Sequence, residues 1–133
     1  MGTVVLDTSV VLGLRDPQDA HHAAAVTAIH GSRQAGDRLV LPCSALAEVL
    51  VGASRLGVAA VNGMEEFVDA IIDVVYPIER EGARVVASYR ARYPTIRLPD
   101  AFVLAVGEIL KADTVFTADH RWKGIDKRVK LIA

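Results

Sequence analysis

The alternation of short apolar runs with longer helical segments constrains the fold of this chain more than any other feature. The run TVVL at 3–6 is rich in β-branched residues and predicts a buried strand, and similar runs recur along the chain. Strands separated by helices form βαβ units, which produce a parallel sheet covered by helices on both faces. We therefore predict an α/β fold with three α/β/α layers around a central parallel sheet. The predicted strands are 3–6, 38–41, 73–78, 114–117 and 129–132, and the predicted helices are 18–36, 44–56, 58–72, 79–93 and 99–112.

The composition fits a single domain over residues 1–133, because 52% hydrophobic residues can supply a core of its own. Cys43 is the only cysteine, which excludes an internal disulfide and a multi-cysteine zinc site, and we expect it to be a small buried residue. No apolar run approaches the roughly 20 residues that cross a bilayer. The first residues also lack the basic stretch of a secretory signal. We expect a cytoplasmic protein without a membrane span.

The charge distribution is uneven. Residues 1–79 contain 4 Lys and Arg against 10 Asp and Glu, a charge of −6, whereas residues 80–133 contain 11 against 6, a charge of +5. A basic C-terminal half suits a nucleic-acid partner, although solvated helix and loop charges would give the same numbers. The residues that we single out as phosphate contacts are Arg90, Arg92, Arg97, Arg121 and Lys123.

Two carboxylates follow predicted strands. Asp7 comes directly after the strand at 3–6, and Asp119 comes two residues after the strand at 114–117. In an open parallel sheet, ligands bind beyond the carboxyl ends of the strands. Each acid also has a purely structural interpretation, since Asp7 can cap a following helix and Asp119 can be a turn residue.

Two further acids are predicted to approach the same edge. Asp100 lies in the first turn of the apolar helix that leads into the strand at 114–117, and Glu48 lies one turn into the helix at 44–56. Helical spacing places Glu48 opposite the apolar stripe of its own helix. The structural alternatives are a favourable helix dipole for Asp100 and a solvated helix face for Glu48.

Four carboxylates at one edge would repel one another unless a cation lay among them. Hard oxygen ligands favour Mg²⁺, with Mn²⁺ as a substitute, and a Mg²⁺ site commonly uses one or two direct carboxylates. We assign Asp7 and Asp100 as the direct metal ligands. Ser9 and Thr117 lie two residues from Asp7 and Asp119, and their hydroxyls can orient a carboxylate or a water.

Four motifs in order give the chain a resemblance to PIN-domain nucleases, and more narrowly to the VapC toxins of bacterial toxin–antitoxin pairs. They are VLDTS with Asp7 and Ser9, ALAEV with Glu48, LPDAFVLA with Asp100, and FTADHRW with Thr117 and Asp119. The sequence departs from the family in two places. Trp122 stands where Phe is more usual, and His120 and Arg121 stand where a further acid is often found, so the contact that Asp119 makes, direct or through water, stays open.

The resemblance implies a PIN fold with a parallel sheet of about five strands. It implies a Mg²⁺- or Mn²⁺-dependent endoribonuclease in which Asp7, Glu48, Asp100 and Asp119 form the catalytic quartet. Hydrolysis by metal-activated water would then leave a 5′-phosphate and a 3′-hydroxyl. It also implies an RNA substrate, a cognate VapB-like antitoxin and a homodimer.

Two other classes of protein stay open from the residues alone. A catalytically inactive PIN-like or receiver-like binding module would keep the acidic pocket without turnover. A phosphatase of the haloacid-dehalogenase type also begins with an aspartate after the first strand, but it requires an acid at the position of Ser9.

Overall fold

The parallel α/β architecture is present in the computed structural model, which describes residues 1–132. The described residues form one sheet of five strands, and every strand pair in it is parallel. Each predicted strand is observed to within two residues at either end. The strands are β1 (Thr3–Leu6), β2 (Arg38–Pro42), β3 (Val74–Tyr76), β4 (Thr114–Thr117) and β5 (Val129–Leu131).

The strand order β3-β2-β1-β4-β5 places β1 at the centre of the sheet. The chain runs outward from β1 to β3 on one side and then returns to build β4 and β5 on the other. This reversal makes the boundary between β1 and β4 a topological switch point, where α/β sheets bind their ligands. Leu6 pairs with Phe116 at this boundary, so Asp7 emerges beside the end of β4.

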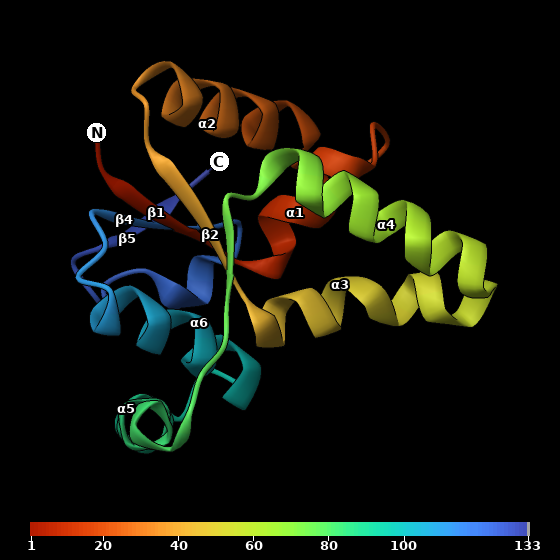
Figure 1. Ribbon diagram of the computed structural model, residues 1–133. Coiled ribbons are helices and arrows are strands. Elements are labelled where there is room, and N and C mark those ends of the chain that lie inside the picture. Colours follow the sequence, from red (N-terminus) through yellow and green to blue (C-terminus); the bar gives the residue numbers. More distant parts are fainter. Residues whose placement is uncertain (133) are drawn as a thin grey trace.

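Helices cover both faces of the sheet, which confirms the three-layer prediction. Figure 1 shows α1 and α2 on one face, α6 with α5 outside it on the other, and the α3–α4 hairpin extending from the end of β2. The helices are α1 (Thr8–Arg15), α2 (His22–Gln34), α3 (Cys43–Leu56), α4 (Val58–Ile71), α5 (Arg80–Arg92) and α6 (Leu98–Ile109), with a short 3₁₀ turn η1 (His120–Trp122).

Helix α6 is the most deeply buried helix, as its apolar sequence predicts. Seven of its 12 residues are buried. At Gly107 a Cβ atom would lie 2.6 Å from the side chain of Val115, so only glycine permits α6 to approach β4 this closely. This close packing holds the C-terminal half of α6 against β4, and Asp100 lies about two turns earlier on the same helix.

The first half of the chain contains the largest corrections to the predicted elements. Helix α1 begins directly after Asp7, although no helix is predicted there as a separate element. The helix predicted from residue 18 begins only at His22, because Asp16 and Asp19 accept backbone N–H bonds and fold the preceding residues into turns. Helix α4 agrees with its predicted bounds of 58–72 to within one residue.

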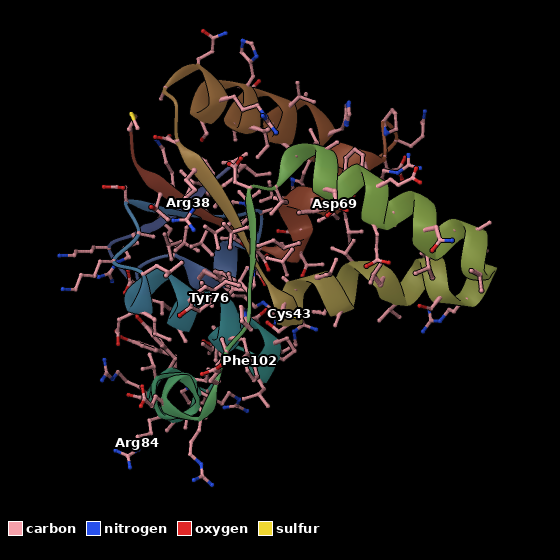
Figure 2. All side chains as sticks on the ribbon, viewed as in Figure 1. Arg38, Cys43, Asp69, Tyr76, Arg84 and Phe102 are labelled. Atoms are coloured by element: carbon pink, nitrogen blue, oxygen red, sulfur yellow. The ribbon has the colours of Figure 1, made fainter. Side chains whose placement is uncertain are left out.

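Cys43 and Trp122, which lie after β2 and β4, differ in burial. Cys43 was expected to be buried and is exposed, because it begins α3 at the outer side of the β2 terminus, where Figure 2 labels it. Trp122 is completely buried and packs the turn after β4 onto the core. A buried indole is not available to stack on a nucleic-acid base.

No helix in the described part of the chain has the length and apolar character needed to cross a membrane.

Candidate active site at the carboxyl edge of the sheet

Asp7 is a buried aspartate at the switch point between β1 and β4. The residue is 7% exposed, and its backbone N–H donates to the carbonyl of Phe116 at 3.0 Å. One carboxylate oxygen, Oδ1, accepts from the backbone N–H of Thr8 at 2.8 Å, which makes Asp7 the N-cap of α1. The structural interpretation of Asp7 as a cap is therefore correct, but it accounts for only one of the two oxygens.

Two hydroxyls hold the second oxygen of Asp7. Ser9 Oγ and Thr117 Oγ1 donate to Oδ2 at 2.7 and 2.8 Å. Each hydroxyl also accepts a backbone N–H, Ser9 from Ala118 and Thr117 from Asp119. Because those bonds occupy the hydroxyls as acceptors, their protons are directed at Asp7, and the carboxylate is held in one orientation.

The electrostatic state of Asp7 reflects opposing effects. Burial raises the pKa of Asp7, and the nearby charge of Asp100 raises it further. The hydrogen bonds from Ser9, Thr117 and the Thr8 backbone act in the other direction, and the net pKa is above its ordinary value. Three donors thus hold the Asp7 carboxylate in place, although burial and Asp100 disfavour its negative charge. A cation bound beside Asp7 would stabilise that charge.

Asp100 is buried at the N-terminus of α6, with 4% of the residue exposed. Its Oδ2 accepts from the backbone N–H of Arg97 at 2.9 Å, and its Oδ1 lies 3.4 Å from the Arg97 guanidinium. Asp100 therefore takes part in capping α6, a role beyond the helix-dipole alternative given for it. It also lies close enough to Asp7 for the two charges to repel.

Asp119 lies after β4, where it caps the η1 turn. Its side chain is bound by the Arg121 guanidinium through both oxygens, with Nη2 at 2.6 Å from Oδ2 and Nε at 3.1 Å from each oxygen. The hydrogen bond from Arg121 lowers the pKa of Asp119. Through its N–H bond to Thr117, Asp119 belongs to the same polar network as Asp7.

Glu48 lies on α3 at the wall of a groove between α1, α3 and α4, which has a volume of about 490 Å³. Thr8 Oγ1 lies 3.5 Å from Glu48 Oε1, a long contact that connects Glu48 to the residue beside Asp7. The buried face of α3 is formed by Ala45, Val49 and Ala53, and Glu48 lies at the flank of this face, half-buried, rather than opposite it as predicted.

The four acids lie along one edge of the sheet, but they do not surround a single point. No group of three His, Cys, Asp or Glu side chains within residues 1–132 is arranged to hold a metal ion. Two of the acids, Asp100 and Asp119, direct oxygens toward arginines of the same chain. The donor chemistry still fits Mg²⁺ at Asp7 and Asp100, since one or two carboxylates completed by water are a usual magnesium site.

Sequence reasoning predicted the acids and the two hydroxyls and missed the partners of the acids. Arg97 and Arg121 were singled out only as phosphate contacts, whereas the structure pairs them with Asp100 and Asp119. The signal available in the sequence was their spacing, three residues before one acid and two residues after the other. All the predicted phosphate contacts, Arg90, Arg92, Arg97, Arg121 and Lys123, are exposed.

Comparison with known proteins connects this geometry to a family. The PIN domain family model matches residues 4–128, nearly the whole chain. The chain belongs to the PIN domain family. No curated protein matches this PIN domain in sequence.

Solved structures with the same fold include components of toxin–antitoxin complexes. A toxin–antitoxin complex from Klebsiella pneumoniae contains a chain with a TM-score of 0.77 and 18% identity, and 98% of each chain is covered. VapBC2 from Rickettsia felis, bound to a DNA fragment from its promoter, matches with a TM-score of 0.73 and 12% identity over 97% of this chain and 96% of that one. VapC20 from Mycobacterium tuberculosis, a toxin that cleaves the sarcin–ricin loop, matches with a TM-score of 0.68 and 17% identity over 88% and 90%. At these identities the likeness establishes the shared fold.

Proposed function

We propose that this PIN domain is a Mg²⁺-dependent endoribonuclease, active also with Mn²⁺, and the toxin of a toxin–antitoxin pair. The observation that carries the proposal is the buried Asp7 carboxylate. Two hydroxyls hold it at the switch point of the sheet, and Asp100 lies close enough to repel it. A protein gains no stability from a buried, disfavoured charge, so a function is the better reason for it.

Each residue of the candidate site has a role in this proposal. Asp7 and Asp100 bind the cation directly, while Ser9 and Thr117 keep the Asp7 carboxylate in the binding orientation. Glu48 and Asp119, which complete the proposed catalytic quartet, hold water at the two flanks of the site.

The substrate is an RNA phosphodiester. When bound, a divalent cation supplies Lewis-acid catalysis, since it withdraws charge from a phosphodiester and lowers the pKa of water. Exposed arginines and Lys123 attract the RNA backbone. The carboxylate of Asp7 or Asp119 accepts the proton of the attacking water, because no histidine or lysine occupies a position of general base in the network described above.

The proposed protein partners are a VapB-like antitoxin and a second copy of the chain. The groove between α1, α3 and α4 adjoins Glu48 and is lined mainly by apolar and small residues, which supports an antitoxin segment that covers the site. Leu56 and Val58 at the tip of the α3–α4 hairpin are 83% and 76% exposed, which supports burial against another chain.

An RNA cleavage assay tests the proposed activity. Purified protein should cleave RNA with Mg²⁺ and lose that activity in excess EDTA, and Asp7→Asn and Asp100→Asn should remain folded without cleaving. Asp69→Asn is the matched control, because Asp69 is an exposed aspartate on α4 (Figure 2) and makes no hydrogen bond or ion pair with the candidate site in the described residues. Full cleavage by the Asp7 and Asp100 variants would reject the assigned site.

One observation favours the alternative of a catalytically inactive binding module. Arginines of the same chain already pair with Asp100 and Asp119, which reduces the negative charge available for a cation. RNA binding that is independent of metal and without turnover would support this alternative. The phosphatase alternative has no such support, because the position two residues after Asp7 holds Ser9, which donates to Asp7 and is no acid.

A further inference from the structure

Arg121 forms an ion pair with Asp119 through two guanidinium nitrogens. Its Nη2 atom lies 2.6 Å from Oδ2 and its Nε atom lies 3.1 Å from each oxygen, so both carboxylate oxygens are occupied by a cation from the chain itself. The backbone N–H of Arg121 also donates to Oδ1 at 2.9 Å. That backbone bond caps the η1 turn independently of the guanidinium, so the turn keeps its cap when the arginine side chain moves away.

Arg97 is placed in the same way beside Asp100. Its backbone N–H donates to Oδ2 at 2.9 Å, while its guanidinium lies 3.4 Å from Oδ1. The strong bond belongs to the backbone and the weak one to the side chain. Asp100 therefore keeps its role in capping α6 when the guanidinium leaves, and Oδ1 becomes available.

In both ion pairs the arginine side chain is exposed and the aspartate side chain is much less so. The side chains of Arg97 and Arg121 are 59% and 52% exposed, against 5% and 22% for Asp100 and Asp119. The pairs also adjoin each other, since the charge of Arg97 acts on Asp119 and the charge of Asp100 acts on Arg121. Both arginines can turn toward solvent without disturbing the core.

A third ion pair shows what a purely structural pair looks like in this chain. Arg128 and Asp126 have side chains only 20% and 13% exposed, and Tyr89 donates to Asp126 at 2.8 Å. That pair is enclosed and lies on the chain just before β5, where it links β5 to α5. In the ion pairs of Arg97 and Arg121, by contrast, the arginine side chains are more than half exposed.

We propose that Arg97 and Arg121 are exchangeable counter-ions, which pair with Asp100 and Asp119 in the metal-free protein and turn to RNA phosphates when a divalent cation binds. The inference rests on the proposed function and adds a coupling to it. At Asp100 a cation and the Arg97 guanidinium compete for the same carboxylate oxygens. At Asp119 the Arg121 guanidinium competes with the cation-bound water that this acid would hold, and a phosphate competes for both guanidiniums. Metal binding and RNA binding must then favour each other, because coupling between two sites is reciprocal.

The affinity for Mn²⁺ alone, measured without RNA, tests the competition directly. Free Mn²⁺ is quantified by electron paramagnetic resonance during titration of the purified protein. Arg121→Gln should bind Mn²⁺ about fivefold more tightly than the wild type, and Arg97→Gln should show a smaller gain because its side-chain contact is longer. Arg38→Gln is the charge-matched control, since Arg38 is exposed at the opposite edge of the sheet (Figure 2), and its affinity should equal that of the wild type.

The RNA side of the exchange is measured in steady-state cleavage. Arg121→Gln should raise KM for RNA more than it lowers kcat, and should reduce the slope of log KM against log salt by about one. Arg121→Lys keeps the charge but cannot form the two-atom fork, so its KM should lie between those of the wild type and Arg121→Gln.

The outcomes separate this inference from the proposed function. Unchanged or weaker Mn²⁺ binding by Arg121→Gln would overturn the exchange while wild-type cleavage with Mg²⁺ still supported the nuclease. A wild type that neither binds Mn²⁺ nor cleaves RNA, with variants that behave alike, would overturn both. Tighter Mn²⁺ binding by Arg121→Gln together with a raised KM supports both.

Discussion

The two edges of the central sheet both carry aspartates, and they use them differently. At the amino edge Asp37, Asp73 and Asp113 each precede a strand, and each accepts a backbone N–H of a neighbouring strand segment at 2.8 Å. None of these three is buried. At the carboxyl edge Asp7 and Asp100 are buried and close enough to repel.

The comparison shows that position relative to the strands, more than residue type, decides what an aspartate does here. An acid that precedes a strand meets free backbone N–H groups at the start of the sheet and stays near water, so one hydrogen bond satisfies it. Asp7, which follows β1 at the switch point, lies beside the end of β4, where hydroxyls and Asp100 are its neighbours. This difference agrees with the proposed ligand site at the carboxyl edge, whereas the amino-edge aspartates satisfy backbone N–H groups.

The largest expected effect is on catalysis, and it tests whether the two edges differ in function. Asp7→Asn should lower the rate of Mg²⁺-dependent RNA cleavage at least about a hundredfold, because a metal ligand is lost while the side-chain volume is kept. Asp113→Asn, the same substitution at the amino edge, should leave the rate unchanged. Equal cleavage rates for the two variants, measured on proteins with the same circular dichroism spectrum, would show that the two edges do not differ in catalysis.

The next effect concerns the hydroxyls that distinguish Asp7 from the amino-edge acids. Ser9→Ala and Thr117→Val each remove one donor to Asp7 Oδ2, and each should weaken Mn²⁺ binding about tenfold. Thr117→Ser, which retains a hydroxyl, should stay closer to the wild type. Wild-type Mn²⁺ affinity in Thr117→Val would mean that the hydroxyl does not position the carboxylate.

A smaller effect should appear in stability at the amino edge. Asp73→Ala and Asp113→Ala each remove the acceptor of one backbone N–H, and each should lower the free energy of unfolding by about 1 kcal/mol. Their cleavage rates with Mg²⁺ should not change. Urea denaturation measures the first quantity, and a loss of activity in either variant would show that the amino edge also shapes the site.

The smallest effect is a pH dependence of the metal-free protein. Burial raises the pKa of Asp7, so ionising this group costs stability at neutral pH, and that cost disappears as the pH falls through the raised pKa. Asn cannot ionise, so Asp7→Asn avoids this cost. The melting temperature of Asp7→Asn minus that of the wild type should therefore be larger at pH 7 than at about pH 4.5, a pH only about half a unit above the ordinary aspartate pKa. Calorimetric scans in EDTA at the two pH values measure it, and a relative melting temperature that rises toward acid would contradict the sign.

The sequence alone determined the local elements and the placement of acids on them. Runs such as TVVL and TVFT are short and β-branched, so strands formed at 3–6 and 114–117, the same bounds that β1 and β4 have. Because Asp7 and Asp119 follow those strands, their location at the carboxyl edge was already fixed by direction in a parallel sheet. Helix ends were less certain, as α2 shows, because aspartate side chains compete for backbone N–H groups within a few residues of the start.

Only the tertiary structure decided which of these segments became neighbours. The pairing of β1 with β4 brings Thr117 to Asp7 across 110 residues, and no local pattern specifies that strand order. The same holds for the guanidiniums on Asp100 and Asp119, since an arginine near an acid in sequence can face the acid, the solvent or an RNA. Local propensity acts over a few residues, whereas strand order and side-chain partners depend on how the whole core packs.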